Sequence, residues 1–588
     1  MNLPRHEYPR PQMERPRWMN LNGQWDFKYD DENQGIKSKW FVGGTYDKKI
    51  IVPYTYQSKM SLINDQDFHD IVWYERQFDL PEDMLGKRII LNFGAVDYKA
   101  DVWVNGTHVT THEGGHIAFS VEITDQVLEK GNTLTLRAED YTFDLELPRG
   151  KQYWLRQSEG IFYTRTTGIW QTVWIEAVER SYIKKIWLTP DIDKKMISLE
   201  YEVDTSCPKL EMSVEIALKD DILIQDTISV INGRGKREFF LDQGISIGWQ
   251  FFEMWTWTPE RPVLFDMTLA LKEDQIILDE IKTYFGMRKV SIVDGKFMLN
   301  NRPYYQKMLL DQGYWEQSLL TAPEDGDFVT DIRLAKEMGF NGVRKHQKIE
   351  DPRFLYHADK MGFLVWGEIA GGYVYSRKYV KRLTQEWVEM VERDYNHPCI
   401  VAWTPQNESW GIDGVMHNKD EQAYATAMYY LTKSLDQTRP VISNDGWDHT
   451  KSDLLTIHDY EFRKDVLLDR YKSVESILGS RPSSRGMFAE GWEYEGQPIL
   501  VTEFGGISYQ KGNWEGWGYS SANSEEDFIM RYYNVISAML ESPLVQGFVY
   551  TQITDVEQEI NGLLTYARQP KVDLSIIREI NEGKWKPE

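Results

Sequence analysis

Two glutamates stand at corresponding places in this chain, each just beyond a short apolar run. Glu408 ends the stretch 404–408 that follows the apolar run 400–403, and Glu503 lies two residues after the apolar run 499–501. Parallel strands of an α/β barrel deliver catalytic side chains at their C-terminal ends. Two carboxylates are the minimum apparatus for cleaving a glycosidic bond. The pair therefore predicts one active site, which neither glutamate would define by itself.

The elements that would position these glutamates form a regular series. After about residue 289, short apolar runs alternate with helix-like stretches, which is typical of βα units. The helix-like stretches include 327–338, 381–395, 421–435 and 525–540. The candidate strands lie near 305–310, 342–346, 364–366, 400–403, 440–443, 454–458, 499–501 and 545–550. Eight such units in roughly 300 residues predict a (β/α)8 TIM barrel at 289–588.

Polar residues follow seven of the eight candidate strands. A structural hydrogen bond explains any one of them, but the opposite end of a barrel has no need of such groups, so the seven together indicate a functional rim. The residues are Asp311 and Gln312, Arg344 and His346, Glu368, Asn407 and Glu408, Asn444 and Asp445, His458 with Asp459 and Tyr460, and Glu503.

The two glutamates need different environments if one attacks as an anion and the other donates a proton. Arg344 would hold one carboxylate ionised by its charge and hydrogen bonds. Trp410 and the apolar surroundings of the fourth strand would raise the pKa of the other carboxyl group by desolvation. The spacing alone leaves open which glutamate has which role.

The first 288 residues have the rhythm of β-structure. Between 1 and 180, alternating runs such as 89–93 and 133–137 are separated by turns, and the run 100–104 ends in an Asn-Gly pair that favours a hairpin. Because no helical stripe interrupts these runs, a β-sandwich is expected. The segment 181–288 repeats the pattern on a smaller scale, with a length that suits an immunoglobulin-like sandwich.

Composition excludes several classes of protein. The 67 basic and 91 acidic residues give a formal net charge of −24, so binding to nucleic acid or to an anionic membrane surface is not expected. The only cysteines, Cys207 and Cys399, lie far apart, which argues against a disulfide framework or a cysteine-rich metal site. The first residues lack the apolar core of a secretory signal, and no run is long enough to span a membrane. We therefore expect a cytoplasmic protein.

Several motifs resemble glycoside hydrolase family 2, the group that contains β-galactosidases, β-glucuronidases and β-mannosidases. The resemblance covers nearly the whole chain and implies a jelly-roll sugar-binding domain, an immunoglobulin-like domain and a catalytic TIM barrel. The motifs are Trp-Tyr-Glu-Arg at 73–76, Gly-Ile-Trp-Gln-Thr-Val-Trp at 168–174, Asn-Gly-Val-Arg at 341–344, Asn-Glu at 407–408 and Thr-Glu-Phe-Gly at 502–505.

The resemblance also implies roles for particular residues. Glu408 would be the general acid/base, Glu503 the nucleophile, and Asn407 the ligand of the sugar 2-hydroxyl. No cofactor is expected, and no obligatory metal, because the metal-binding pattern of the large β-galactosidases is not clear beyond Glu368. Further substrate-binding residues are expected on the same rim: Arg344, His346, His458, Tyr460, Asp311, Glu368 and Trp410.

The nature of the sugar follows from departures from the family pattern. Family β-glucuronidases carry an Asn-x-Lys triplet near the eighth strand, which this sequence lacks, and the corresponding stretch 551–559 is rich in acids. An anionic sugar would be repelled there, so glucuronides are disfavoured. The stretch 344–347 reads Arg-Lys-His-Gln, where many family members have Arg-Thr-Ser-His-Tyr-Pro, which weakens a simple transfer of β-galactosidase activity.

These observations predict a retaining exo-glycosidase that removes a terminal neutral sugar, with β-galactose as the first choice. An α-L-arabinofuranoside, a β-galactofuranoside and a β-mannoside are also compatible with the sequence, ahead of a β-glucuronide. A non-catalytic carbohydrate-binding protein is a remote alternative, because both glutamates are retained. The expected partner is a glycoside or oligosaccharide, and a homo-oligomer is possible because members of the resembled family are often oligomeric.

Overall fold

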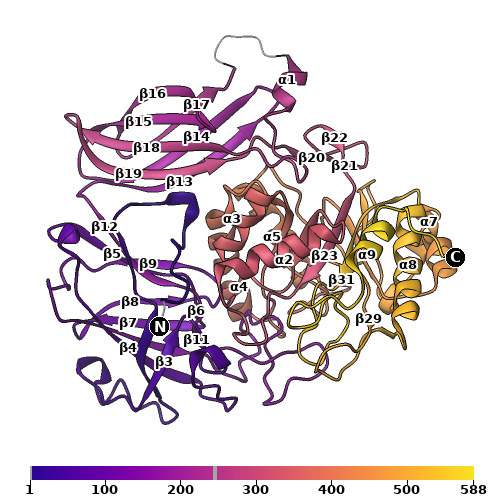
Figure 1. Ribbon diagram of the computed structural model, residues 1–588, viewed down its shortest axis with the longest axis horizontal. Helices are drawn as coiled ribbons and strands as arrows, with labels where there is room; N and C mark the ends of the chain where they lie inside the picture. The colour runs from indigo at the N-terminus through magenta and orange to yellow at the C-terminus, as the bar shows by residue number, and fades with distance from the viewer. Residues whose placement is uncertain (1–2, 243–247, 588) are drawn as a thin grey trace.

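The computed structural model describes residues 3–242 and 248–587 of the chain. Three parts are visible in the ribbon diagram: an N-terminal β-domain in indigo and purple, a second β-domain in magenta, and an α/β part in salmon to yellow (Figure 1). Both β-domains lie against the α/β part (Figure 1). The boundaries expected after residues 180 and 288 remain predictions.

The N-terminal domain contains two antiparallel sheets around one apolar core. The predicted hairpin is present, since β7 (Lys99–Val104) and β8 (Thr107–Glu113) pair on either side of Asn105 and Gly106, which both have positive φ. One sheet has the order β1 (Trp18–Asn20), β12 (Val173–Val178), β5 (Arg88–Phe93) and β9 (Phe119–Glu122). The other has the order β3 (Lys48–Val52), β2 (Gly23–Tyr29), β4 (Ile71–Phe78), β10 (Asn132–Glu139), β7 (Lys99–Val104) and β8 (Thr107–Glu113). The short strands β6 (Val96–Asp97) and β11 (Gly168–Ile169) form a separate pair.

The second β-domain has two layers joined at one corner. The only pairing between β16 and β17 is Ile231 with Arg234, so the seven-stranded sheet divides into a three-stranded and a four-stranded layer, as in an immunoglobulin-like sandwich. One layer contains β13 (Tyr182–Asp191), β14 (Met196–Asp204) and β17 (Arg234–Phe240), and the other β16 (Asp221–Ile231), β15 (Lys209–Leu218), β18 (Phe265–Glu273) and β19 (Ile276–Phe285). A short helix, α1 (Trp249–Glu253), precedes β18.

The C-terminal part is built on a parallel sheet. Its seven strands run in the order β26 (Ile400–Thr404), β25 (Leu364–Glu368), β24 (Gly342–Lys345), β23 (Gln306–Asp311), β31 (Val545–Thr551), β28 (Ile499–Gly505) and β27 (Leu455–Asp459). Their burial is nearly complete from end to end, as expected for barrel strands covered on both faces. The small antiparallel sheet β20 (Val290–Val293), β21 (Lys296–Leu299) and β22 (Arg302–Pro303) precedes them.

The predicted fifth strand at 440–443 is not a regular strand, which corrects that expectation. The segment fills the barrel position between β26 and β27: isolated bridges pair Trp403 with Val441 and Asn407 with Asp445 on the β26 side, and on the β27 side the His458 N–H donates to the Gly446 carbonyl at 3.3 Å. Pro440 has no N–H to donate, and the Val441 N–H donates to the side chain of Asp453 at 2.8 Å instead of to a neighbouring strand. Eight positions around the barrel are therefore occupied, seven of them by continuous strands.

Helices cover the outside of this barrel. The helix-like stretch predicted at 381–395 is confirmed as α4, which buries Leu383, Trp387, Met390 and Val391. That helix begins after Ser376, whose hydroxyl accepts a hydrogen bond from the Tyr379 N–H. The helices are α2 (Asp325–Glu337), α3 (Pro352–Met361), α4 (Arg377–Asp394), α5 (Lys419–Leu435), α6 (Lys464–Arg470), α7 (Val474–Gly479), α8 (Glu525–Glu541) and α9 (Leu574–Asn581).

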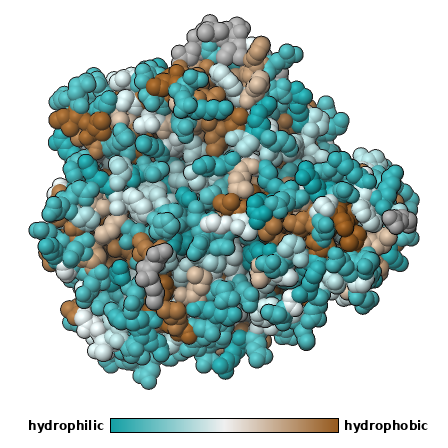
Figure 2. All heavy atoms as spheres, viewed as in Figure 1, coloured by the Kyte–Doolittle hydropathy of each residue, from teal (hydrophilic) through white to brown (hydrophobic). Residues whose placement is uncertain are grey.

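Hydrophilic side chains predominate on the face shown in Figure 2, and hydrophobic side chains gather there in several separate groups. The described residues include no helix with the length and apolarity needed to cross a membrane. Cytoplasmic location and oligomeric state stay predictions.

Candidate active site

Arg344, on β24, occupies the centre of the polar rim with a side chain that is 0 % exposed. Its Nε donates to Glu368 Oε2 at 2.7 Å, and its Nη1 donates to Glu503 Oε1 at 3.0 Å. Asp445 Oδ2 is 2.7 Å from the same Nη1, and Nη2 donates to Asn407 Oδ1 at 2.6 Å. A guanidinium is always charged and holds five N–H donors in one plane. One side chain therefore orients four groups from different parts of the rim.

Glu408 and Glu503 face each other across this centre. Glu503 lies within β28, whereas Glu408 lies four residues after the end of β26, in a loop with left-handed backbone (φ +51°). Such a conformation is unfavourable for a residue with a side chain. It is held by bonds from the Glu408 N–H to the Asp445 carbonyl and from the Ser409 N–H to the Asn444 side chain. A carboxylate oxygen of Glu408 lies within 4.8 Å of one of Glu503.

His458 links the two glutamates. Its Nδ1 is 2.8 Å from Glu408 Oε1 and 3.5 Å from Glu503 Oε2, while its Nε2 is 3.0 Å from Asp445 Oδ2. Carboxylate acceptors at both nitrogens require both to be donors, which makes the ring an imidazolium. Burial opposes this charge, but Glu503 and Asp445 outweigh it and raise the pKa of His458 to about 10.

The acidity of Glu408 differs from the expectation. Burial raises the pKa of its carboxyl group, as predicted for the apolar surroundings, but the hydrogen bond and charge of His458 outweigh burial, so the net pKa is lowered. Trp410 does not decide the outcome, because a cation lies in direct contact with the carboxylate. Glu408 is therefore ionised at neutral pH.

The remaining rim residues surround Glu503 and Arg344. The Tyr460 hydroxyl donates to Glu503 Oε2 at 2.7 Å. His346 Nδ1 lies 3.0 Å from Glu368 Oε1, and burial together with the nearby cations lowers the pKa of His346 well below its usual value, so the ring is neutral. Burial raises the pKa of Glu368 in spite of its bond to Arg344. These contacts bring Arg344, His346, Glu368, Asn407, Glu408, His458, Tyr460 and Glu503 into one cluster.

Two of the predicted site residues lie differently. Asp311 is outside the cluster, because its carboxylate pairs with the ammonium of Lys345, which points away from the side of the strand that carries Arg344. Trp410 lies beside the cluster, with its ring centroid 5.8 Å from that of Phe162 and 5.3 Å from that of Tyr373. Phe162 comes from the N-terminal domain, which thus contributes to the wall of the site.

Three further residues complete the site. Asp445, predicted only as a polar residue after the fifth strand, contacts both cations of the cluster. Tyr519 stacks on Tyr460 with ring centroids 3.4 Å apart. Lys151, from the N-terminal domain, has its ammonium 5.1 Å from the ring centroid of Trp410. Neither Lys151 nor Tyr519 carries a local sequence signal, because only tertiary contacts bring them here.

Two groups of residues have side chains of the kind that binds metals. In the first group, Glu408, His458 and Glu503, both nitrogens of His458 hold protons and offer no lone pair to an ion. In the second, Asp359 and His397 bond to each other at 2.5 Å, and the Cys399 thiol donates to a backbone carbonyl. Hydrogen bonds within the protein therefore use the ligand atoms of both groups. The absence of an obligatory metal stays a prediction.

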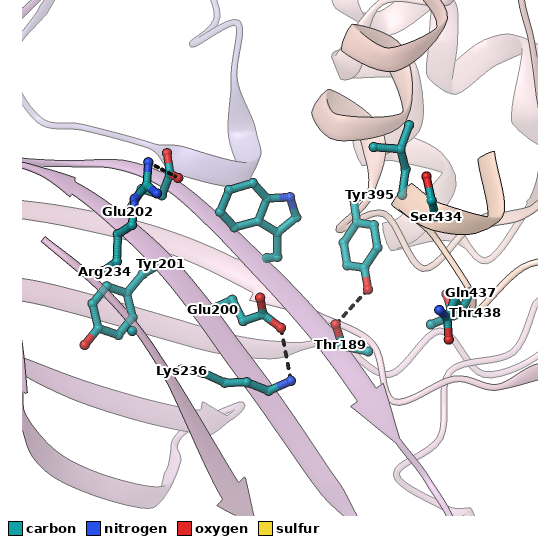
Figure 3. Close-up of a pocket in the computed structure, with 13 residues that line it drawn as sticks. Thr189, Glu200, Tyr201, Glu202, Arg234, Lys236, Tyr395, Ser434, Gln437 and Thr438 are labelled. Carbon is teal, nitrogen blue, oxygen red and sulfur yellow. Dashed lines mark hydrogen bonds and ion pairs between the residues drawn. The ribbon is translucent and has the colours of Figure 1, made fainter. Parts of the chain in front are cut away.

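A separate cleft of about 720 Å³ lies between the second β-domain and the barrel (Figure 3). Its walls carry the ion pairs Glu200–Lys236 and Glu202–Arg234, and Thr189 bonds to Tyr395 across it (Figure 3). None of the carboxylates of the rim lines this cleft, so it is distinct from the candidate active site.

Models of known protein families match all three parts of the chain. The model described as the family 2 glycosyl hydrolase TIM barrel domain matches residues 290–583, which is half of the chain. The models described as the family 2 sugar binding domain and as glycosyl hydrolases family 2 match residues 18–142 and 181–288. The chain belongs to glycosyl hydrolase family 2.

Known family 2 proteins are similar over most of this length. The β-glucuronidase of Rattus norvegicus is 24% identical over 95% of this chain and 90% of its own length. The β-galactosidase of Thermoanaerobacter pseudethanolicus is 26% identical over 72% of this chain and 53% of its own. The structure of a β-glucuronidase from an uncultured Clostridium matches with a TM-score of 0.78 and 22% identity, covering 97% of this chain and 99% of that one. The predicted family 2 architecture and the assignment as an O-glycosyl hydrolase are confirmed.

Proposed function

We propose that this family 2 enzyme is a retaining exo-glycosidase that removes a terminal neutral sugar, with a β-galactoside as the preferred substrate. Glu503 acts as the nucleophile and Glu408 as the general acid/base. The substrate is a glycoside or oligosaccharide whose last sugar enters the rim between them.

One observation carries this proposal: carboxylate oxygens of Glu408 and Glu503 lie within 4.8 Å of each other. Retaining glycosidases hold their two carboxyl groups roughly 5–5.5 Å apart, whereas inverting enzymes need about 6.5–9.5 Å to admit a water molecule. The short separation supports direct attack by one carboxylate. Arg344 and Tyr460 both bond to Glu503, which supports its assignment as the carboxylate that is aimed at the anomeric carbon.

The reaction then proceeds in two displacements. Glu503 attacks the anomeric carbon while Glu408 gives a proton to the departing glycosidic oxygen, so that a glycosyl ester on Glu503 and a free alcohol form. Glu408, now a carboxylate, removes a proton from water, which attacks the same carbon and releases the sugar and Glu503. The first step requires a proton on Glu408, and His458 Nδ1 lies 2.8 Å from it as a neighbouring donor.

Asn407 is suited to bind a sugar hydroxyl. Its Oδ1 accepts from Arg344, while its buried Nδ2 has no hydrogen-bond partner among the residues that the structure describes. A buried amide donor without a partner is costly unless a ligand supplies an acceptor. This supports the role in binding the 2-hydroxyl that the family resemblance implies.

The preference for a neutral sugar rests on charge. Beyond β31, Asp555, Glu557 and Glu559 are all buried; Asp555 pairs with Lys571 at 2.6 Å, while Glu559 lies near enough to Glu503 for the two negative charges to interact. A β-glucuronide is the second candidate, because several relatives with nearly full coverage are named β-glucuronidases. The relative named β-galactosidase covers less of the chain but supports the first candidate.

A panel of nitrophenyl glycosides tests the substrate directly. The β-galactoside should have the highest kcat/KM, and hydrolysis confined to the glucuronide would overturn the preference for a neutral sugar. The α-L-arabinofuranoside, β-galactofuranoside and β-mannoside in the same panel test whether a different neutral sugar is preferred. Binding of sugars without turnover of any glycoside would indicate a non-catalytic carbohydrate-binding protein.

Two variants test the roles of the glutamates. Glu503→Ala should lose activity by several powers of ten, while Glu408→Ala should keep part of its activity toward nitrophenyl leaving groups. Azide should rescue Glu408→Ala with a glycosyl azide of retained configuration, and Glu503→Ala with the inverted product. Glu386→Gln is a matched control, since Glu386 is buried at the domain contact and burial raises its pKa to about 8. Normal activity in Glu503→Ala would remove that residue from its role.

A further inference from the structure

A long loop of the N-terminal domain lies on the catalytic rim. Between β10 and β11, the N–H groups of Arg149 and Gly150 both donate to the Gly371 carbonyl, at 3.0 and 2.9 Å. The Tyr373 N–H donates back to the Leu145 carbonyl at 2.8 Å. These bonds fix the loop to the segment that follows β25, the strand that ends with Glu368.

The approach of this loop to the barrel is very close at Gly150. This residue has φ +60°, and a Cβ atom there would lie 2.5 Å from the Gln347 carbonyl oxygen. Only glycine fits such a position without displacing the backbone. The next residue, Lys151, is thereby held at a fixed point above the rim, and its carbonyl accepts from the Tyr163 N–H at 2.8 Å.

Lys151 is a buried lysine without a carboxylate partner. It is 7 % exposed, and apart from the ring of Trp410 its ammonium makes no hydrogen bond or ion pair with the described part of the chain. Two other buried lysines of the rim differ in this respect. Lys345 and Lys348 both pair with Glu350, at 2.8 and 3.0 Å. The Lys151 ammonium, with no carboxylate paired to it, is therefore available to an acceptor oxygen of a ligand.

The ammonium of Lys151 faces the reacting groups. Its charge acts on Glu408, on Glu559 and on His346, and it lowers the proton affinity of all three. Trp410, over whose ring the ammonium lies, follows Glu408 by two residues. The cation therefore lies beside the space between the rim of the barrel and the loop of the N-terminal domain, where the proposed function places the terminal sugar.

We propose that Lys151 binds an oxygen of the terminal sugar, so that the N-terminal domain supplies a specificity-determining residue to the barrel. This inference rests on the proposed function for the position of the sugar. The shared ligand chemistry is a hydrogen-bond acceptor oxygen, either a hydroxyl of a neutral sugar or the carboxylate of a uronic acid. Substrate binding gives the ammonium the acceptor that the free protein does not provide.

The variant Lys151→Met tests this inference, with Arg156→Met as a control. Methionine keeps the length and apolar stem of lysine. Arg156 lies on the same loop but is exposed and pairs with Asp67. On the best glycoside of the wild-type panel, Lys151→Met should raise KM by tenfold or more and lower kcat by less, whereas Arg156→Met should match the wild type.

Thermal unfolding separates binding from a structural role. Because the Lys151 ammonium makes no hydrogen bond or ion pair with the described part of the chain, Lys151→Met should melt at about the same temperature as the wild type. A lower melting temperature together with an unchanged KM would overturn the inference. So would a change confined to the pH profile of kcat with an unchanged KM, since Lys151 would then act only on the ionisation of Glu408.

The panel also identifies the source of the oxygen. A larger loss on the glucuronide than on neutral glycosides would assign Lys151 to a carboxylate, and similar or larger losses on neutral glycosides would assign it to a hydroxyl. If the wild type hydrolyses a glycoside and Lys151→Met is equally active, the inference fails while the proposed function stands. If no glycoside is hydrolysed, the binding of galactose and of glucuronate is measured by tryptophan fluorescence for the wild type and for Lys151→Met. The inference about Lys151 would be overturned if Lys151→Met binds these sugars as the wild type does, or if the wild type binds neither.

Discussion

Replacement of Arg344 by lysine is the most informative perturbation of the site. The variant keeps one positive charge in a fully buried position, so it tests geometry rather than net charge. The guanidinium bonds to Glu368, Glu503 and Asn407 and lies 2.7 Å from Asp445. An ammonium donates at most three hydrogen bonds from one atom and has no planar fork.

The magnitude follows from these contacts. Hydrogen bonds that involve a charged group contribute about 1.5–3 kcal/mol each. If lysine keeps two of the four contacts, the other two are lost, and the free energy of unfolding falls by roughly 3–6 kcal/mol. Glu503 loses its fixed orientation as well, and a misplacement of about 1 Å in an active site lowers the rate on the order of 100-fold. We expect Arg344→Lys to be folded, less stable than the wild type and less active by about 100-fold or more.

Arg439→Lys is the matched control. Arg439 is also buried, pairs with Asp436 at 2.6 Å, and donates to the carbonyls of Ile400, Tyr395 and His397 at the opposite end of β26. Urea unfolding, monitored by tryptophan fluorescence, should show similar losses in the free energy of unfolding for both variants. The kcat/KM for the best nitrophenyl glycoside should fall only in Arg344→Lys. If that variant kept kcat/KM within threefold of the wild type, the role of Arg344 in orienting Glu503 would be wrong.

Three further predictions concern the Tyr460 hydroxyl, the charge of His458 and the need for a metal ion. Tyr460→Phe removes the hydroxyl that donates to Glu503, so kcat should fall by about 10- to 100-fold, and an unchanged kcat in steady-state assays would contradict this contact. The pKa of His458 is raised from 6.5 to about 10, which corresponds to roughly 5 kcal/mol of stabilisation that is fully present below pH 6.5 and lost as the pH rises through about 10. Scanning calorimetry of His458→Asn should therefore show a flatter loss of melting temperature over this range, and equal slopes would refute the imidazolium. Dialysis against EDTA should leave kcat/KM unchanged, and a loss that Mg²⁺ restores would show that a metal is needed.

The positions of the rim residues were accessible from the sequence because strand periodicity is a local property. An apolar run followed by a polar residue predicts where a barrel strand ends, and parallel strands of one barrel end at one rim. This sufficed to bring Arg344, Asn407, Glu408, His458 and Glu503 together. The same rule failed at 440–443, where a hydrogen bond from the Val441 N–H to a side chain replaces the regular ladder of hydrogen bonds between strands.

What only the tertiary structure decided is the set of contacts between segments distant in sequence. The lowered pKa of Glu408 depends on His458, which is 50 residues away, and the sequence predicted the opposite direction from neighbouring apolar residues. Lys151 meets Trp410 only because a glycine loop docks on the barrel. Side-chain types and their local spacing therefore determined the two carboxylates and the fold that presents them. Electrostatic interactions depend on distance in space rather than in sequence, so the folding of the barrel determined the ionisation of Glu408, and the docking of the N-terminal domain added the residues that complete the pocket.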